Sequence, residues 1–358
     1  MNSFQKIGIT TVIAVYLLIW VGGLVRSTGS GMGCPDWPKC FGQWIPPINE
    51  KELPKDYKDI YANKRKEKNE KLAKYLDFLG WIELSNAIKG DKNTYFEADF
   101  NATKTWIEYI NRLIGVLIGF LIILTFIFSF KYWKKDKLVV YLSFTSIILV
   151  LFQGWIGSIV VSTNLLPGLI SFHMSLAILQ VFLLMWAVAR SFDVKINANQ
   201  FNKNIKALNI VLIISIVLVF IQIMLGTQVR QAIDIVAKKI GENARGTWVE
   251  NVGLTFYIHR SFSWIILFFH ILLVFQTNKL SLQLGKWVNL SKILLGIVIV
   301  EFMTGVGLAY LGMPAILQPL HLLLSVMIIG FHFVLLIILN PTRFFKSNTL
   351  KEKNYQLV

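Results

Sequence analysis

Eight long apolar segments constrain this chain more than any other feature of its sequence. They cover roughly residues 8–26, 105–130, 138–162, 168–190, 207–229, 255–276, 288–311 and 316–340. A helix needs about 20 such residues to cross the hydrocarbon core of a bilayer. The segments are helix-length, not short and alternating, so they predict an all-α integral membrane protein with eight transmembrane helices and not a β-barrel.

Composition and charge agree with a membrane location. Of the 358 residues, 55% are hydrophobic and 16% are charged, a balance that excludes a soluble globular protein. The first apolar segment is too long for a signal peptide and has no cleavage motif after it, so we interpret it as the first span. The net charge of +16 comes largely from loops, which excludes nucleic acid as the expected partner. Lys and Arg gather in the loops at 131–137 and 190–206 and in the tail after Pro341, so the positive-inside rule predicts cytoplasmic termini. No Arg- and Ser-rich transit peptide precedes the first span, so we expect a bacterial inner membrane and not an organelle.

An internal repeat divides the chain. The segment "EYINR" (108–112) matches "FYIHR" (256–260) at an offset of 148 residues, and the same offset carries His173 onto His321. Arg26 matches Arg230 at an offset of 204, and the difference of 56 residues is an insertion in the outer loop 27–104. We predict two tandem four-helix bundles, 1–200 and 201–358, related by a pseudo-two-fold axis along the membrane normal. The charged middle of the outer loop forms either amphipathic helices at the outer surface or a solvated spacer.

All five histidines lie inside predicted spans. His259 and His321 each lie about one turn from the outer end of an even-numbered span, at matching depth in the same half. Imidazole is an axial ligand of haem iron, and the cores of helix bundles hold such sites. A single buried histidine is more often a hydrogen-bonded core residue, but two at equivalent depth predict a pair of haem ligands.

Four arginines near the outer ends of spans fit the same interpretation: Arg26, Arg112, Arg230 and Arg260. The positive-inside rule disfavours arginine on that side, and guanidinium groups bind carboxylates such as haem propionates in bidentate fashion. The alternative is that their side chains extend to lipid headgroups, which fits Arg26 and Arg230 best because they end their spans.

A carboxylate and two cysteines complete the candidate residues. Glu108 and Arg112 are four residues apart and share a helix face, so they form either an ion pair or one side of a reactive pocket. Cys34 and Cys40 lie six residues apart outside the first span, where the environment is oxidising. They predict a disulfide, with two free thiols as the alternative.

These motifs together resemble the haem A synthase family. "GGLVRSTGSGMGCPDWPKC" (22–40) is similar to the family's first-loop segment with its cysteine pair, and "EYINR" is similar to its E-x-x-H-R motif. "SFHMSLA" (171–177), "YIHRSFSW" (257–264) and "LQPLHLLLS" (317–325) resemble its three other histidine sites. This chain has Asn111 where the family pattern has histidine, and the insertion of 56 residues is more than the core pattern needs.

The resemblance implies an oxidoreductase that converts the C8 methyl of haem O into the formyl group of haem A, with water as the oxygen source. It implies haem b on His259 and His321, and the substrate haem on His173 with Asn111 beside it. Glu108 would be the catalytic carboxylate. Haem O synthase would donate the substrate, and membrane lipid surrounds the chain. The sequence leaves a homo-oligomer open.

Two other functions remain open from the sequence. A multi-haem b-type cytochrome would use His270 and His332, which follow His259 and His321 by 11 residues and so lie on the same helix faces about 16 Å deeper. A haem transporter or assembly factor without chemistry is the other alternative, because parallel repeats and intramembrane charges also occur in transporters.

Overall fold

The computed structural model describes residues 1–90, 99–163, 166, 168–192, 203–281 and 285–344. It confirms eight helices that are long and apolar enough to cross a membrane. These are α1 (Ser3–Ser27), α4 (Ala102–Ser129), α5 (Lys137–Ser162), α6 (Leu169–Arg190), α7 (Lys203–Ile240), α8 (Leu254–Lys279), α10 (Val288–Tyr310) and α11 (Leu317–Leu339). The chain is therefore a multi-pass membrane protein.

Local sequence sets where several helices begin. Asn2 and Gln5 form a reciprocal capping box at the start of α1, and Asn101 accepts a hydrogen bond from the Lys104 N–H at the start of α4. Asp136 caps α5 by accepting from the Leu138 N–H. These side chains satisfy backbone donors that would otherwise lack partners at the helix ends.

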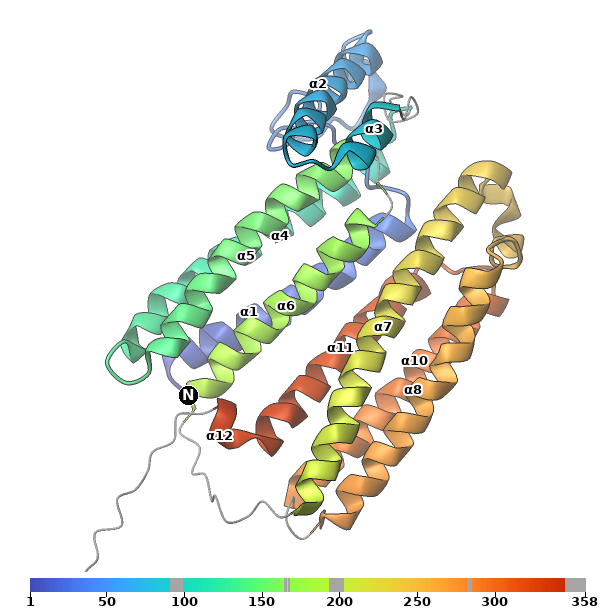
Figure 1. Ribbon diagram of the computed structural model, residues 1–358. Helices are drawn as coiled ribbons and strands as arrows, with labels where there is room; N and C mark the ends of the chain where they lie inside the picture. Colours follow the sequence, from blue (N-terminus) through green and yellow to red (C-terminus); the bar gives the residue numbers. More distant parts are fainter. Residues whose placement is uncertain (91–98, 164–165, 167, 193–202, 282–284, 345–358) are drawn as a thin grey trace, which may run out of the picture.

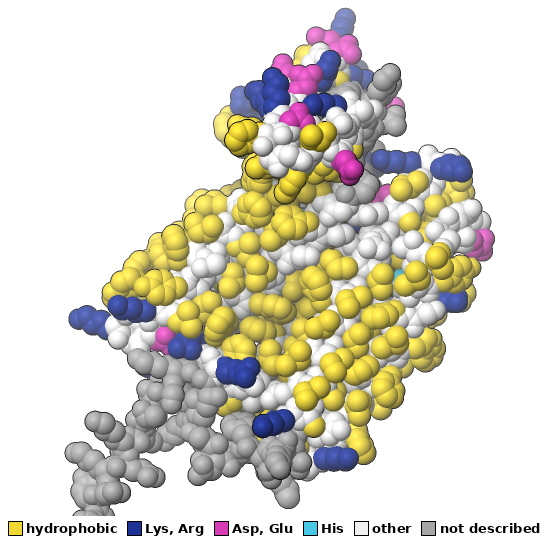
Figure 2. All heavy atoms as spheres, in the orientation of Figure 1, with side chains coloured by type: hydrophobic (Ala, Val, Ile, Leu, Met, Phe, Trp, Pro, Cys, Tyr) yellow, Lys and Arg dark blue, Asp and Glu magenta, His cyan; other side chains and the backbone are white. Residues whose placement is uncertain are grey.

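The long helices expose apolar side chains to their surroundings. Figure 2 shows hydrophobic side chains spread over the surface of the bundle, while charged groups gather at its two ends. Leu117, Phe120 and Leu151 are more than half exposed, as expected for side chains that face lipid. In the most apolar 18-residue stretch of α11, half of the residues are buried, against 11% in the corresponding stretch of α5, so α11 is the central helix.

The spans pack as two neighbouring groups (Figure 1). Helix α1 packs against α4 and α6, and α5 packs against both α4 and α6. In the second group, α7 and α10 each pack against α8 and α11, while contacts between α1 and α11 join the groups. The boundary predicted at residue 200 lies outside the described residues, and the pseudo-two-fold axis stays a prediction.

The outer segment between α1 and α4 forms helices, as one of the two interpretations predicted. Helix α2 (Tyr57–Phe78) packs against α3 (Ile82–Gly90) beyond one end of the long helices (Figure 1). The side chain of Asn69 in α2 donates a hydrogen bond of 2.9 Å to the Ser162 carbonyl at the end of α5. The outer segment is thereby fixed to the bundle.

Short elements connect the longer ones. They are η1 (Glu50–Glu52), η3 (Phe130–Tyr132), η5 (Glu242–Thr247), η6 (Val249–Asn251), η7 (Gly285–Trp287) and α12 (Pro341–Phe344). The Arg190 Nη1 at the end of α6 donates to the Phe344 carbonyl at 2.9 Å, so α12 lies at the same end of the bundle as the N-terminus (Figure 1).

Candidate functional site

The structure brings His259 of α8 and His321 of α11 together. Their ring centroids are 6.3 Å apart and their planes are inclined by 77°. Each ring lies against a glycine of a neighbouring helix: a Cβ added at Gly226 of α7 would lie 3.2 Å from the His259 Cε1, and one at Gly305 of α10 would lie 3.2 Å from the His321 Cε1. The glycines therefore form the walls against which the two imidazoles pack.

The separation of the two rings fits one iron between them. A metal–imidazole bond is about 2 Å long and the ring nitrogen lies about 1 Å from the ring centre, so two axial imidazoles have centroids about 6 Å apart. The observed 6.3 Å agrees with this value. Neither Nε2 atom has a hydrogen-bond partner among the described residues, whereas the His321 Nδ1 contacts the Thr304 hydroxyl at 2.9 Å. The residues present therefore fit a bis-histidine haem.

The inner pair, His270 and His332, has a different geometry. Their ring centroids are 4.8 Å apart, and the side chains are 1% and 0% exposed. Each Nδ1 contacts the carbonyl one turn earlier in its own helix, at 2.6 Å for His270 and 2.8 Å for His332. The rings contact one another and leave no space for an iron, so the geometry does not favour the multi-haem cytochrome.

The N-terminal half lacks a second imidazole. His173 lies on α6, and its Nδ1 is buried without a partner among the described residues. A Cβ added at Gly157 of α5 would lie 3.8 Å from the His173 Cε1, an ordinary contact and looser than the packing of His321. Asn111 on α4 has a buried Oδ1 that likewise has no partner in the described part of the chain. Two polar groups thus remain available for a ligand in this half.

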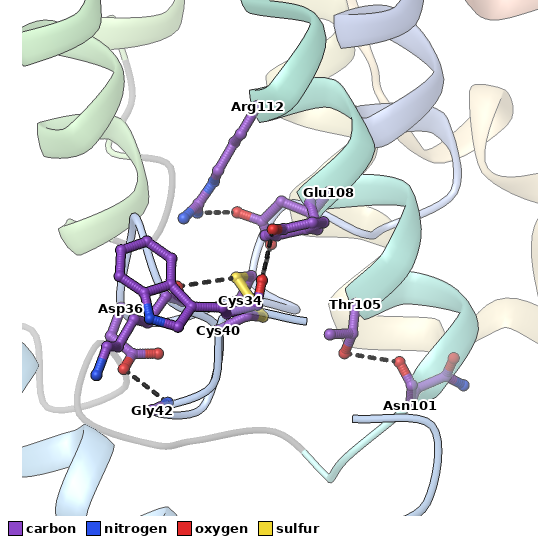
Figure 3. Close-up of a disulfide and its surroundings, with 11 residues drawn as sticks. Cys34, Asp36, Cys40, Gly42, Asn101, Thr105, Glu108 and Arg112 are labelled. Carbon is purple, nitrogen blue, oxygen red and sulfur yellow. Dashed lines mark hydrogen bonds and ion pairs between the residues drawn. A yellow bond between two sulfur atoms is a disulfide. The ribbon is translucent and has the colours of Figure 1, made fainter. Parts of the chain in front are cut away.

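Glu108 is held by both its own helix and the first outer loop (Figure 3). The Cys34 N–H donates to its Oε2 at 2.9 Å, and the Arg112 guanidinium donates to its Oε1. The Glu108 side chain is only 3% exposed. The structure therefore forms the ion pair, the simpler of the two interpretations of this motif, and adds a loop contact that the sequence did not predict.

The loop that reaches Glu108 contains the predicted disulfide. Cys34 and Cys40 are bonded to one another, and both are fully buried, which confirms the pairing. Phe41 continues this loop and packs edge-on against Tyr57 and Tyr61 of α2. The disulfide loop thus connects the outer helices to the catalytic candidate on α4.

Arg26 and Arg230 share a partner that the sequence analysis missed. Asp234 of α7 accepts from the Arg26 Nη2 at 2.9 Å and pairs with the Arg230 Nη2 at 2.8 Å. The Arg230 Nη2 also donates to the Arg26 carbonyl at 3.1 Å. The signal was present, because Arg230 and Asp234 are four residues apart on one helix. This cluster joins the C-terminal end of α1 to the C-terminal part of α7.

The other two arginines lie over aromatic rings. The Arg112 guanidinium is 5.9 Å from the centre of the Trp37 ring. The Arg260 guanidinium is exposed and lies 5.0 Å from the Tyr257 ring and 5.7 Å from the Phe256 ring. Both contacts are cation–π interactions, and they hold each guanidinium near the N-terminal end of its helix.

Comparison with known proteins shows which family the chain resembles. Residues 5–333 match the model of the COX15-CtaA family, described as cytochrome oxidase assembly protein. A heme A synthase from Shewanella oneidensis is 23% identical over 291 residues, covering 80% of this chain and 75% of that protein. One from Pelagibacter ubique is 24% identical over 362 residues, covering 93% of this chain and 96% of that protein. One from Ehrlichia canis is 30% identical over 181 residues, 49% of this chain and 45% of its own length. A family match over nearly the whole bundle, together with the paired histidines, shows that the chain belongs to the haem A synthase family of cytochrome oxidase assembly proteins.

Proposed function

We propose that this chain is a haem A synthase, a membrane oxidoreductase that converts the C8 methyl of haem O into the formyl group of haem A. The observation that carries the proposal is the family match over residues 5–333, supported by relatives of that name that align along most of the chain. If water supplies the oxygen, converting a methyl to a formyl group releases four electrons and four protons. The protein must therefore provide routes for both.

The C-terminal half would hold haem b between His259 and His321. The 6.3 Å separation of the rings and the glycines behind them support this assignment. When bound, haem b would supply one-electron redox chemistry between the substrate and an acceptor. Arg260 lies one residue after His259 and is exposed, so its guanidinium is available to bind a propionate.

The N-terminal half would bind the substrate haem through His173. Asn111, in the place of the second imidazole, offers a buried amide oxygen that accepts a hydrogen bond from water but is a poor ligand for iron. Arg112 carries five N–H donors, so it can bind a propionate while it remains paired with Glu108. The two arginines bound to Asp234 would neutralise acidic groups near the junction of the halves.

Glu108 would accept protons released during the oxidation. It is the buried carboxylate of α4, and the Cys34 N–H and Arg112 hold its two oxygens in fixed positions. Phe256 occupies the equivalent place in the second half, so a carboxylate is present at this position in the substrate half alone. That asymmetry supports a chemical role and not a scaffold role for Glu108.

The proposed location is a bacterial inner membrane with both termini in the cytoplasm. The Lys- and Arg-rich loops support this orientation, and the N-terminus and α12 lie at the same end of the bundle. The haem sites would then lie toward the outer leaflet, under the disulfide loop. Haem O synthase is the proposed donor of the substrate.

The test is to express the chain in cells that make haem O and lack haem A synthase, and to analyse the extracted haems by mass spectrometry. We expect haem A with the wild type and with Glu83→Ala, an exposed control on α3, and none with Glu108→Ala. Unconverted haem O with the wild type would favour the transporter alternative. Equal haem A from Glu108→Ala would remove Glu108 from the chemistry.

A further inference from the structure

We infer that Thr304 and Glu301 of α10 are positioning residues for the haem ligand His321. They hold its imidazole in the tautomer that carries the proton on Nδ1, and this leaves the Nε2 lone pair for iron. The inference rests on the proposed function, because it assigns a role to groups around the proposed haem b ligand. Neither residue was among the sequence candidates for the site.

Counting hydrogens at Thr304 fixes the tautomer. Its hydroxyl has one hydrogen, which is donated to the main-chain carbonyl of Glu301 at 2.7 Å. The same oxygen lies 2.9 Å from the His321 Nδ1, so in this contact it must accept. The Nδ1 therefore carries the proton, and the Nε2 has the free lone pair that a metal ligand requires.

The Glu301 carboxyl group lies beside the same nitrogen. Its Oε1 is 3.3 Å from the His321 Nδ1 and also contacts the Ser325 hydroxyl. Ser325 lies one turn after His321 on α11 and also contacts the His321 carbonyl at 2.9 Å. The carboxyl group of α10 is thus anchored to the helix that carries the ligand, so the ring cannot rotate without breaking several contacts.

The network serves only one of the proposed ligands. The His259 Nδ1 is buried and has no partner among the described residues. In the N-terminal half, Gln153 takes the place of Glu301, and its Nε2 donates to the Leu176 carbonyl at 3.1 Å. Hydrogen bonds to the second nitrogen of a ligating imidazole make it a stronger donor to the metal. His321 would therefore be the stronger donor of the two proposed ligands.

The experiment measures the midpoint potential of haem b in purified full-length protein by redox titration. A stronger donor favours ferric iron, so removing the network should raise the potential in Thr304→Val and in Glu301→Leu. We expect about a tenfold change in the ferric-to-ferrous ratio at a fixed potential, about 59 mV for a one-electron couple. Thr304→Ser keeps the hydroxyl and should restore the wild-type value.

Thr125→Val is the matched control, because Thr125 is also a buried threonine within a span but its hydroxyl bonds to Thr11 on α1. Its potential should equal that of the wild type. If Thr304→Val does not accumulate in the membrane, Glu301→Leu decides the question. If every variant that retains haem b has the wild-type midpoint potential, the inference about Thr304 and Glu301 is wrong and the proposed function stands. If the wild-type protein binds no haem b, the proposed cofactor is wrong.

Discussion

Gly305 provides the sharpest test of the packing around the proposed haem ligand. The substitution Gly305→Ala adds one methyl group that would lie 3.2 Å from the His321 Cε1. Ordinary contacts between such carbons are about 3.5–4.0 Å, so either the ring or helix α10 must shift by a few tenths of an ångström. Since the Thr304 hydroxyl holds the Nδ1 side of the same ring at 2.9 Å, a shift of the imidazole also strains that contact.

Gly296 of the same helix provides a control that isolates the loss of stability caused by the contact with His321. An added Cβ there meets nothing within 4 Å, so Gly296→Ala should gain up to about 1 kcal/mol from helix propensity. Gly305→Ala gains the same amount but loses about 1–3 kcal/mol through overpacking. The difference in the free energy of unfolding between the two variants is therefore about 1–3 kcal/mol, with Gly305→Ala the less stable.

Thermal denaturation and the haem b spectrum of both purified variants are the assays. We expect a lower Tm and less haem b per chain for Gly305→Ala than for Gly296→Ala, because the displaced imidazole no longer meets the iron at bonding distance. The same Tm and the same haem content in both variants would refute the reasoning, because the added methyl would then have found room without moving His321.

Three further predictions concern other contacts. Asp234→Asn leaves Arg26 and Arg230 without their shared carboxylate. Since all three side chains are about a fifth to a quarter exposed, we expect the free energy of unfolding to fall by about 1–3 kcal/mol. An unchanged Tm would contradict this. Cys40→Ser opens a loop with a separation of six residues and should lower stability by about 2 kcal/mol; a reductant should lower the Tm of the wild type to that of the variant, and no response to reductant would count against it. Asn111→His adds an imidazole at the position that matches His259, so the purified variant should hold more haem per chain by pyridine haemochrome assay. An unchanged haem-to-protein ratio would contradict the last expectation.

The eight spans could be predicted because length and apolarity alone determine whether a helix crosses a bilayer. The contact between His259 and His321 could be predicted because both lie at the same depth on helices of one bundle. Only the rotation of each helix about its own axis then decides whether the two side chains face one another. The spacing of 11 residues correctly placed His270 and His332 on inner turns of the same helices. It could not give the 4.8 Å between their rings, because that distance depends on how closely α8 and α11 approach one another.

The contacts that were missed depend on segments distant in sequence. The Cys34 N–H reaches Glu108 across 74 residues, and only the folded loop brings them together. Asp234 was missed although it lies one turn from Arg230, because its second partner, Arg26, is 208 residues away. Asparagine at 111 was recognised as a departure, but its buried, unpartnered oxygen follows from the packing of α4.

The two halves differ in a way that matches the different needs of a resident cofactor and a substrate. In the second half, a Cβ added at either neighbouring glycine would lie 3.2 Å from an imidazole carbon, and Thr304 contacts the Nδ1 of His321. In the first half, His173 has looser contacts, its Nδ1 has no partner among the described residues, and an amide replaces the second imidazole. A product must leave after each turnover, and binding energy that holds substrate and product equally does not accelerate the reaction. Under the proposed haem assignment, a single, loosely held imidazole on the substrate side would favour release of the product, whereas the two more closely packed imidazoles would retain haem b.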